Sequence, residues 1–331
     1  SAANLVATAS GQNSNIGIVS GGVVAATPGN INLSAPTGLA QRFVLQQGGS
    51  LTSTGNAGTA YLLTGGTGNQ TFEISGTVAI QGNGLFINAG DGDDLIFVDS
   101  TAMFANSNIS HTLNGGAGND RLYLYGSGNA PLFTIGIERL DVDAGAGGTR
   151  TISENGSFSV VNVLNGTLSA RRVQALGQAN STVNISAGAV LDLFFTAPSA
   201  VNNSFSGTGT IIQNTIDPVT YGGSSSGFTG IFRNLSGANA TIITSDAFGS
   251  GSIVNDGTLS FGGLNLANNI SGTGQVIVTG SGNSRLSGNN TFSGGLDIQG
   301  GILDADSVNA LGIGFVTSTT AGGILALGNS N

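Results

Sequence analysis

Acidic residues gather in short glycine-rich turns between positions 65 and 125. Carboxylates are the side chains best suited to hold a hard cation or to move a proton. Three segments superpose there without gaps: Gly65–Glu73, Ala89–Phe97 and Gly115–Tyr123. If each segment fills one coil of a solenoid, stacking at about 4.8 Å brings their acidic side chains together.

Two interpretations of these turns stay open. A hard cation needs six to eight oxygen ligands, and stacked carboxylates with glycine carbonyls nearby predict a calcium site. The alternative is that glycine supplies left-handed turn conformations and that the acidic residues only cap the turns. The candidate calcium ligands are Asp91, Asp93, Asp94 and Asp120.

Catalytic groupings are few. Gly223–Gly227 has the G-x-S-x-G spacing around Ser225, but a nucleophile elbow needs a strand-to-helix turn and a histidine partner. The one histidine, His111, lies far earlier in the chain. Arg121 beside Asp120 is the grouping that would suit a lyase or a hydrolase. We therefore predict no enzyme, with a secreted polysaccharide-acting enzyme on the same fold as the alternative.

Aromatic residues follow the acidic turns in short alternating strands. Alternation directs Phe72, Ile96 and Leu122 inward, and Ile74, Val98 and Leu124 two residues later. The residues predicted to face outward near carboxylates are Phe97, Tyr123 and Tyr125. Such a patch can stack on sugar rings and is a candidate binding site. The alternative is that the rings merely line the strand surface or lie under a loop.

A repeat in the second half positions the remaining elements. Leu286–Gly312 alternates apolar and polar residues between glycine turns, and weaker copies lie upstream. Ser226–Gly230 matches Asn290–Gly294, and Asp246–Gly249 matches Asn309–Gly312 at nearly the same offset. One repeat therefore spans three coils of roughly 21 residues. The residues expected to point inward are Leu296, Ile298, Ile302, Leu303 and Leu311.

These motifs carry two resemblances. The run LSGNNTFSGG, followed by GGIL and NALG, resembles the autotransporter-associated β-strand repeat of type V secreted bacterial passenger domains. Gly115–Tyr123 matches the nonapeptide of calcium-binding RTX proteins in full. Ala89–Phe97 departs at its first residue, and Gly65–Glu73 has Gln70 in place of aspartate. RTX repeats recur every nine residues, whereas these occur once per coil.

The autotransporter resemblance implies a fold, a location and partners. It implies a right-handed, three-faced parallel β-helix, displayed on or shed from a Gram-negative cell surface, with a role in virulence. Such a passenger acts as a scaffold or adhesin for a host surface protein or glycan. A C-terminal translocator barrel would lie outside this sequence, which we expect to be a processed or excised fragment.

We expect one elongated all-β domain over residues 1–331, with about 14 coils. Residues 1–64 form degenerate coils, 65–125 carry the Gly-Asp turns and 126–331 carry the autotransporter repeats. Pro198 and Pro218 predict a longer excursion, a loop projecting from the stack, over Phe205–Ile216.

The amino-acid composition excludes several classes of binding partner and of chemistry. The 331 residues include 57 glycines and no tryptophan, and only 8% are charged, which favours an all-β chain over a helical or disordered one. Eight arginines and no lysine stand against 17 acidic residues, a net charge of -9. This balance argues against nucleic acid and anionic membrane as partners. Absence of cysteine excludes disulfides and thiol chemistry, and no apolar run is long enough to insert directly into a membrane.

Overall fold

The computed structural model describes residues 5–8, 15–18, 23–26, 31–34, 40–47, 50–53, 60–79, 84–100, 103–104, 111–320 and 322–327. The fold is all-β and 2% helical, and its parallel sheets form a β-solenoid of about 12 turns. The predicted parallel β-helix is therefore confirmed. The chain divides into two compact units, Ser1–Leu168 and Ser169–Asn331, and the expectation of one continuous domain stays a prediction.

In the Ser1–Leu168 unit each coil contributes strands to parallel sheets. One sheet contains, in spatial order, β1 (Leu5–Thr8), β4 (Ile31–Ser34), β7 (Ala60–Thr64), β10 (Gly84–Asp91), β13 (His111–Ala117) and β16 (Leu132–Ile135). A second contains β2 (Asn15–Ile18), β5 (Ala40–Leu45), β8 (Asn69–Ile74), β11 (Leu95–Val98), β14 (Arg121–Tyr125), β17 (Arg139–Asp143) and β19 (Val160–Asn165). A third contains β3 (Val23–Ala26), β6 (Ser50–Ser53), β9 (Thr77–Ala79) and β12 (Met103–Phe104). Beside these lie β15 (Gly128–Ala130), β18 (Thr149–Ile152) and β20 (Thr167–Ala170), the last of which spans the division between the units.

The Ser169–Asn331 unit repeats the plan and adds the short 3-10 helix η1 (Val173–Leu176). Its first sheet contains β21 (Thr182–Ile185), β24 (Ser204–Gly207) and β27 (Gly227–Phe228). Its second contains β22 (Val190–Leu193), β25 (Thr210–Gln213), β28 (Ile231–Asn234), β30 (Ser252–Asn255) and β33 (Ile270–Ser271). Its third contains β23 (Ser199–Val201), β26 (Val219–Tyr221), β29 (Asn239–Ile242), β31 (Thr258–Phe261), β34 (Gln275–Val278), β36 (Leu296–Ile298) and β38 (Val316–Thr317). Its fourth contains β32 (Asn265–Leu266), β35 (Asn283–Leu286), β37 (Ile302–Ala305) and β39 (Ile324–Leu327).

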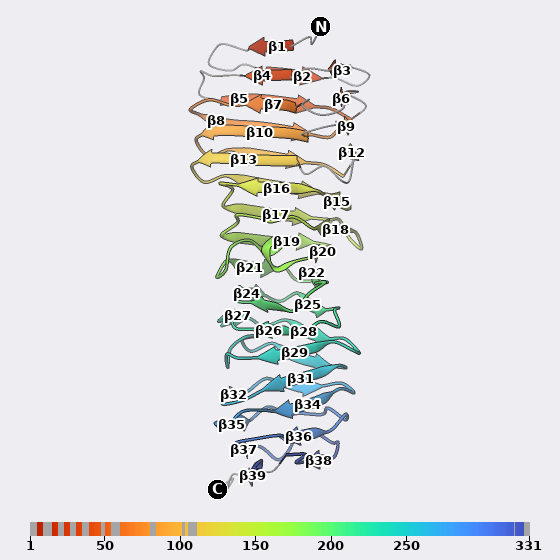
Figure 1. The fold of residues 1–331 in the computed structure, drawn as a ribbon, viewed down its shortest axis with the longest axis vertical. Coiled ribbons are helices and arrows are strands. Elements are labelled where there is room, and N and C mark those ends of the chain that lie inside the picture. The colour runs from red at the N-terminus through yellow and green to blue at the C-terminus, as the bar shows by residue number, and fades with distance from the viewer. Residues whose placement is uncertain are drawn as a thin grey trace. The chain divides into compact units, whose positions relative to one another are not determined.

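Coil length explains why about 12 turns replace the expected 14 or so. Within each unit, strands of successive coils stack one above another (Figure 1). In the first unit Ile31 pairs with Tyr61 of the next coil. In the second unit Thr210 pairs with Ile231, which is much closer along the chain. The early coils are thus longer than the repeat in the second half, so fewer of them fit in the chain.

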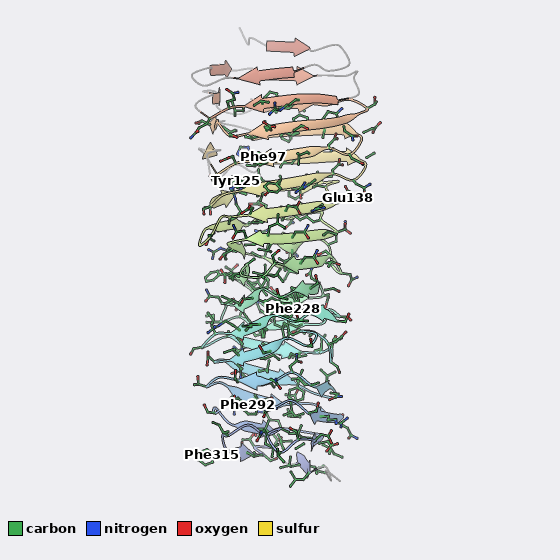
Figure 2. All side chains as sticks on the ribbon, turned by 180° about the vertical axis from the view of Figure 1, so that it is seen from behind. Phe97, Tyr125, Glu138, Phe228, Phe292 and Phe315 are labelled. Carbon is green, nitrogen blue, oxygen red and sulfur yellow. The ribbon has the colours of Figure 1, made fainter. Side chains whose placement is uncertain are left out.

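Alternation places the core between the sheets. The six predicted inward residues of β8, β11 and β14 are 4% exposed or less, so that prediction is confirmed: Phe72, Ile74, Ile96, Val98, Leu122 and Leu124. Phe228 and Phe292 lie inside the second unit, whereas Phe315 lies on its outside (Figure 2). None of the helical segments within the described ranges combines the length and hydropathy needed to cross a membrane.

Of the residues predicted to point inward in the second unit, some are buried and others are not. Leu296, Ile298 and Leu303 are buried as expected. Ile302 and Leu311 are only half-buried, which corrects the prediction for them. Ile302 precedes buried Leu303 in β37, so alternation turns it away from the core. In the turn at Leu311, the neighbouring Ala310 takes the buried position.

The predicted projecting loop between the two prolines is wrong. Residues Phe205–Ile216 instead contribute to β24 and β25, which pair with the strands of neighbouring coils. The prolines occupy corners of ordinary coils: Ser199, directly after Pro198, donates its backbone N–H to the Pro218 carbonyl at 3.0 Å. Proline tolerates such positions because no ladder hydrogen bond is required from its nitrogen.

Candidate functional site

The Gly-Asp turns form a ladder of carboxylates that cap backbone amides. The Gln70 backbone N–H donates to Asp94 Oδ1 at 2.6 Å, and the Asp94 N–H donates to Asp120 Oδ1 at 2.8 Å. The Asp120 N–H in turn donates to Glu138 Oε2 at 2.8 Å. Each carboxylate therefore accepts a backbone N–H from the turn of the preceding coil. This agrees with the interpretation that the acidic residues cap the turns, except that each one caps its neighbour's turn. Figure 2 labels Glu138, the last member of this carboxylate ladder.

Glu138 was missed by the sequence reasoning. Its coil carries no Gly-Asp turn, but the register pairs Arg121 with Arg139, so Glu138 stands where Asp120 stands one coil earlier. The signal was the shared pattern of an acid followed by arginine, Asp120–Arg121 and Glu138–Arg139.

Burial raises the pKa values of two members of the ladder, Asp94 and Asp120. Asp94 and Asp120 are 2% and 1% exposed. Desolvation raises the pKa of Asp94 to about 7 and also raises the pKa of Asp120, more than the backbone hydrogen bonds lower them. The Oδ2 atoms of both residues have no hydrogen-bond partner among the described residues. Near neutral pH, Asp94 is therefore divided between its charged and neutral forms.

The other two candidate calcium ligands lie at the rim. Asp91 and Asp93 are exposed. Asp93 Oδ1 accepts the Asn119 backbone N–H at 2.9 Å, and the Asp93 N–H donates to Asn69 Oδ1 at 2.9 Å. Within the described part of the chain, no group of three or more metal-ligating side chains converges. The structure supports capping as the role of Asp93, Asp94 and Asp120, and calcium binding stays a prediction.

An aromatic patch lies on the outward side of β11 and β14. Phe97 and Tyr123 are register partners whose ring centroids lie 5.5 Å apart with an interplanar angle of 12°. Tyr125 stacks on Phe97 at 6.3 Å and is 46% exposed. Figure 2 labels Phe97 and Tyr125 close to one another. The predicted outward placement is thus observed, although its binding role stays a prediction.

Charged pairs flank the patch along the direction in which the coils stack. On one side Arg42 donates to Glu73, with Nε 3.0 Å from Oε1, and Glu73 is the register partner of Phe97. A groove of about 400 Å³ lies there, lined by residues that include Arg42, Glu73 and Asp99. On the other side lies Asp141, the register partner of Tyr123. On the side of Glu73 the patch thus has a polar rim that can receive hydroxyl or amide groups of a ligand, whereas Asp141 is buried beneath its arginine partners.

Arg121 does not join Asp94 and Asp120, the one grouping that would have suited the alternative of a lyase or a hydrolase. Strand alternation turns its side chain outward, where it lies 5.0 Å from the Tyr123 ring centroid and forms an ion pair with Asp141. Asp141 is fully buried and also accepts from Arg139 Nε at 2.9 Å. The lyase or hydrolase grouping therefore has no shared cleft.

His111 and Ser225 are structural residues. His111 is 1% exposed and its Nδ1 accepts the Leu85 backbone N–H at 3.0 Å. Burial lowers the pKa of His111 to about 4, so the ring is neutral at pH 7. Ser225 is also 1% exposed, and its Oγ accepts the Phe205 N–H at 2.9 Å. An exposed nucleophile elbow is not formed at this serine.

Comparison with known proteins identifies a distant relative. The chain is 29% identical over 317 residues to the adhesin BmaC autotransporter of Brucella suis biovar 1 (strain 1330). The match covers 86% of this chain but 9% of that protein, so the chain spans a small part of its relative's length. No family model matches the chain, and no solved structure matches it. Together, the weak homology to an adhesin and the β-solenoid fit an autotransporter passenger domain.

Proposed function

We propose that this chain is a segment of a surface-displayed or secreted autotransporter passenger that acts as an adhesin, without enzymatic turnover. Homology to an autotransporter adhesin supports an adhesin-like passenger at the cell surface. The same homology fits a translocating domain elsewhere in such a protein. The finer proposal is that the chain binds a host surface glycan or protein.

The observation that carries the finer proposal is the stacked aromatic patch of Phe97, Tyr123 and Tyr125 on the exterior of a solenoid. Stacked rings present flat apolar faces at small cost in side-chain entropy, because the two inner rings are already held by each other. Polar groups at the rim, such as Glu73, orient a ligand. Repeated coils add further weak contacts along the same surface.

The test removes the patch and measures adhesion. We expect the triple variant Phe97→Ala, Tyr123→Ala, Tyr125→Ala to bind immobilised glycans and matrix proteins at least tenfold more weakly, about 1.4 kcal/mol. A matched control removes three exposed aliphatic side chains from the same unit, Leu62→Ala, Ile135→Ala and Leu164→Ala, and should retain binding.

Both variants are first checked by circular dichroism for an intact solenoid. Equal loss of adhesion in the patch variant and in the control would contradict the role of the patch. Shortening of a polysaccharide by the purified protein, lost in Arg121→Ala or Asp120→Ala, would instead favour the enzyme.

A further inference from the structure

Two adjoining grooves lie at one corner of the Ser169–Asn331 unit. The first, of about 450 Å³, is lined by Arg171–Gln174 and by Phe195–Ala200. The second, of about 440 Å³, begins at Phe194–Thr196 and continues over Asn214–Asp217 in the next coil. Phe195 and Thr196 line both grooves, so the grooves adjoin each other across successive coils.

Arginines give the first groove its charge. Arg171 and Arg172 are the only adjacent basic residues in a chain of net charge -9. Among the described residues, no carboxylate lies within ion-pair distance of Arg171, whereas four other arginines each pair with an aspartate or glutamate: Arg42, Arg121, Arg139 and Arg285. A cation without an internal carboxylate partner is a natural point for an external acid group.

An aromatic ring separates this charge from the second groove. Arg171 lies over the Phe194 ring, with its guanidinium carbon 4.4 Å from the ring centroid. Phe194 is nevertheless 37% exposed and lines the second groove. Its backbone N–H donates to the Ala170 carbonyl at 3.0 Å, which fixes the ring at the corner. Contact with the guanidinium restricts the ring further, because the aromatic face attracts the cation.

Hydrogen-bonding groups lie beyond the ring. Asn214 and Asp217 line the far part of the second groove with exposed Ile216 between them. The bend is held from inside, since Thr215 Oγ1 donates to the Phe195 carbonyl at 2.7 Å and accepts the Asp217 N–H at 3.2 Å. Along the corner the order is therefore cation, ring face, apolar contact and then amide and carboxylate.

We propose that this corner binds an acidic oligosaccharide, a chain of pyranose units of which one carries a carboxylate. Arg171 receives the carboxylate through guanidinium hydrogen bonds, and the neighbouring charge of Arg172 adds to the attraction. The neighbouring sugar places its C–H face against the part of the Phe194 ring that Arg171 leaves exposed, where the aromatic surface attracts it. Asn214 can donate hydrogen bonds to, or accept them from, the hydroxyl groups of sugars further along the oligosaccharide. The Asp217 carboxylate accepts hydrogen bonds from such hydroxyls. A carboxylate at Asp217 disfavours a uniform polyanion, so the chemistry selects an acid at one end and neutral hydroxyls at the other.

The experiment measures binding of oligosaccharides to the whole chain by calorimetry. The probes are a tetrasaccharide with one terminal uronate, its neutral counterpart in which the carboxylate is reduced to an alcohol, and poly-glutamate. We expect the uronate probe to bind and both Arg171→Ala and Phe194→Ala to weaken it at least tenfold, about 1.4 kcal/mol. The control Arg233→Ala removes an exposed arginine from β28 of the same unit and should leave binding unchanged.

Each other outcome overturns the proposal. If the uronate probe does not bind at millimolar concentration, the proposal is wrong. Equal binding of the neutral probe means that the arginines do not recognise the acid. Equal binding of poly-glutamate, or equal loss in Arg233→Ala, means general attraction of polyanions. Because this corner and the aromatic patch share no residue, the patch variant should bind the uronate probe normally, so failure here leaves the proposed adhesin function standing.

Discussion

At the scale of single residues, Asp94 makes stability depend on pH. Its pKa is about 7 in the folded chain because burial disfavours the charge, against about 3.9 when unfolded. The folded chain therefore holds the proton more tightly. The contribution of Asp94 to the free energy of unfolding is fully present below pH 4 or so and is lost as pH rises to about 7, by at most about 4 kcal/mol.

Asp94→Asn should abolish much of this pH dependence. Asparagine keeps an oxygen that can accept the Gln70 N–H but carries no charge to desolvate. We expect the variant to unfold at higher urea concentration than the wild type at pH 8, and at a similar concentration at pH 4. Asp91→Asn, which alters an exposed acid of the same turn, should change neither value. Equal pH profiles for wild type and Asp94→Asn would contradict the buried, proton-binding state.

The same variants decide the calcium interpretation. If these aspartates only cap the turns, as the backbone amides donated to Oδ1 of Asp93, Asp94 and Asp120 indicate, millimolar calcium should leave the unfolding temperature unchanged. A bound cation would instead raise the unfolding temperature by mass action. A rise that Asp91→Asn or Asp94→Asn removes would restore the predicted metal site.

The sequence predicted part of this ladder for a definite reason. Gap-free superposition of the turns fixes the register, so the stacking of Asp94 beside Asp120 followed from spacing alone. Asp141 and Arg171 were not predicted as site residues. Asp141 follows its register partner Tyr123 by 18 residues, whereas the Gly-Asp segments recur after 24 and 26 residues, and Arg171 and its partner Phe194 lie beyond the last of these segments. Without a shared motif, a small difference in coil length moves a side chain to the other face.

At the scale of elements, the turn glycines set how closely coils approach. Gly116 in β13 has a φ of +105°, and a Cβ there would overlap the Gly90 carbonyl oxygen of the neighbouring coil. Gly116→Ala should therefore combine backbone strain, about 1–3 kcal/mol, with overpacking of a further 1–3 kcal/mol or so. Unfolding in urea, followed by circular dichroism, measures the loss.

Gly147→Ala is the matched control. Gly147 also has a positive φ, +70°, but no atom lies within 4 Å of its Cβ position. Gly147→Ala should therefore lower the free energy of unfolding only by the cost of backbone strain. If both substitutions cost the same free energy, the close approach of the coils at Gly116 does not limit stability.

The placement of strands could be predicted where apolar and polar residues alternate regularly. The prediction failed where it relied on prolines as markers of a loop. Hydrophobic residues two apart predicted the buried faces of β8, β11 and β14 correctly. Pro198 and Pro218 predicted a projecting loop, because proline is usually a turn residue in globular domains. In a solenoid every coil already turns at its corners, so proline there marks an ordinary corner rather than an excursion.

At the scale of the whole molecule, a solenoid transmits a defect only through neighbouring coils. Phe248 is 1% exposed. Its ring lies 3.9 Å from Phe232, 5.0 Å from Tyr221 and 6.4 Å from Phe205, centroid to centroid, so it joins side chains of successive coils. Phe248→Ala should cost about 3–5 kcal/mol locally. We expect faster amide hydrogen exchange in β26 and β29, and unchanged exchange in β37 of the same unit.

Phe315→Ala supplies the comparison, because Phe315 is 88% exposed in the same unit and its loss should leave exchange in β26 and β29 unaltered. The distribution of the change, rather than its size, tests the architecture. A globular core opens as one cooperative body, so Phe248→Ala would then accelerate exchange equally in all strands of the unit. A chain of nearest-neighbour coils instead confines the opening to the strands around the missing ring. Uniform acceleration that reached β37 would therefore contradict independent coil-by-coil stabilisation within this unit.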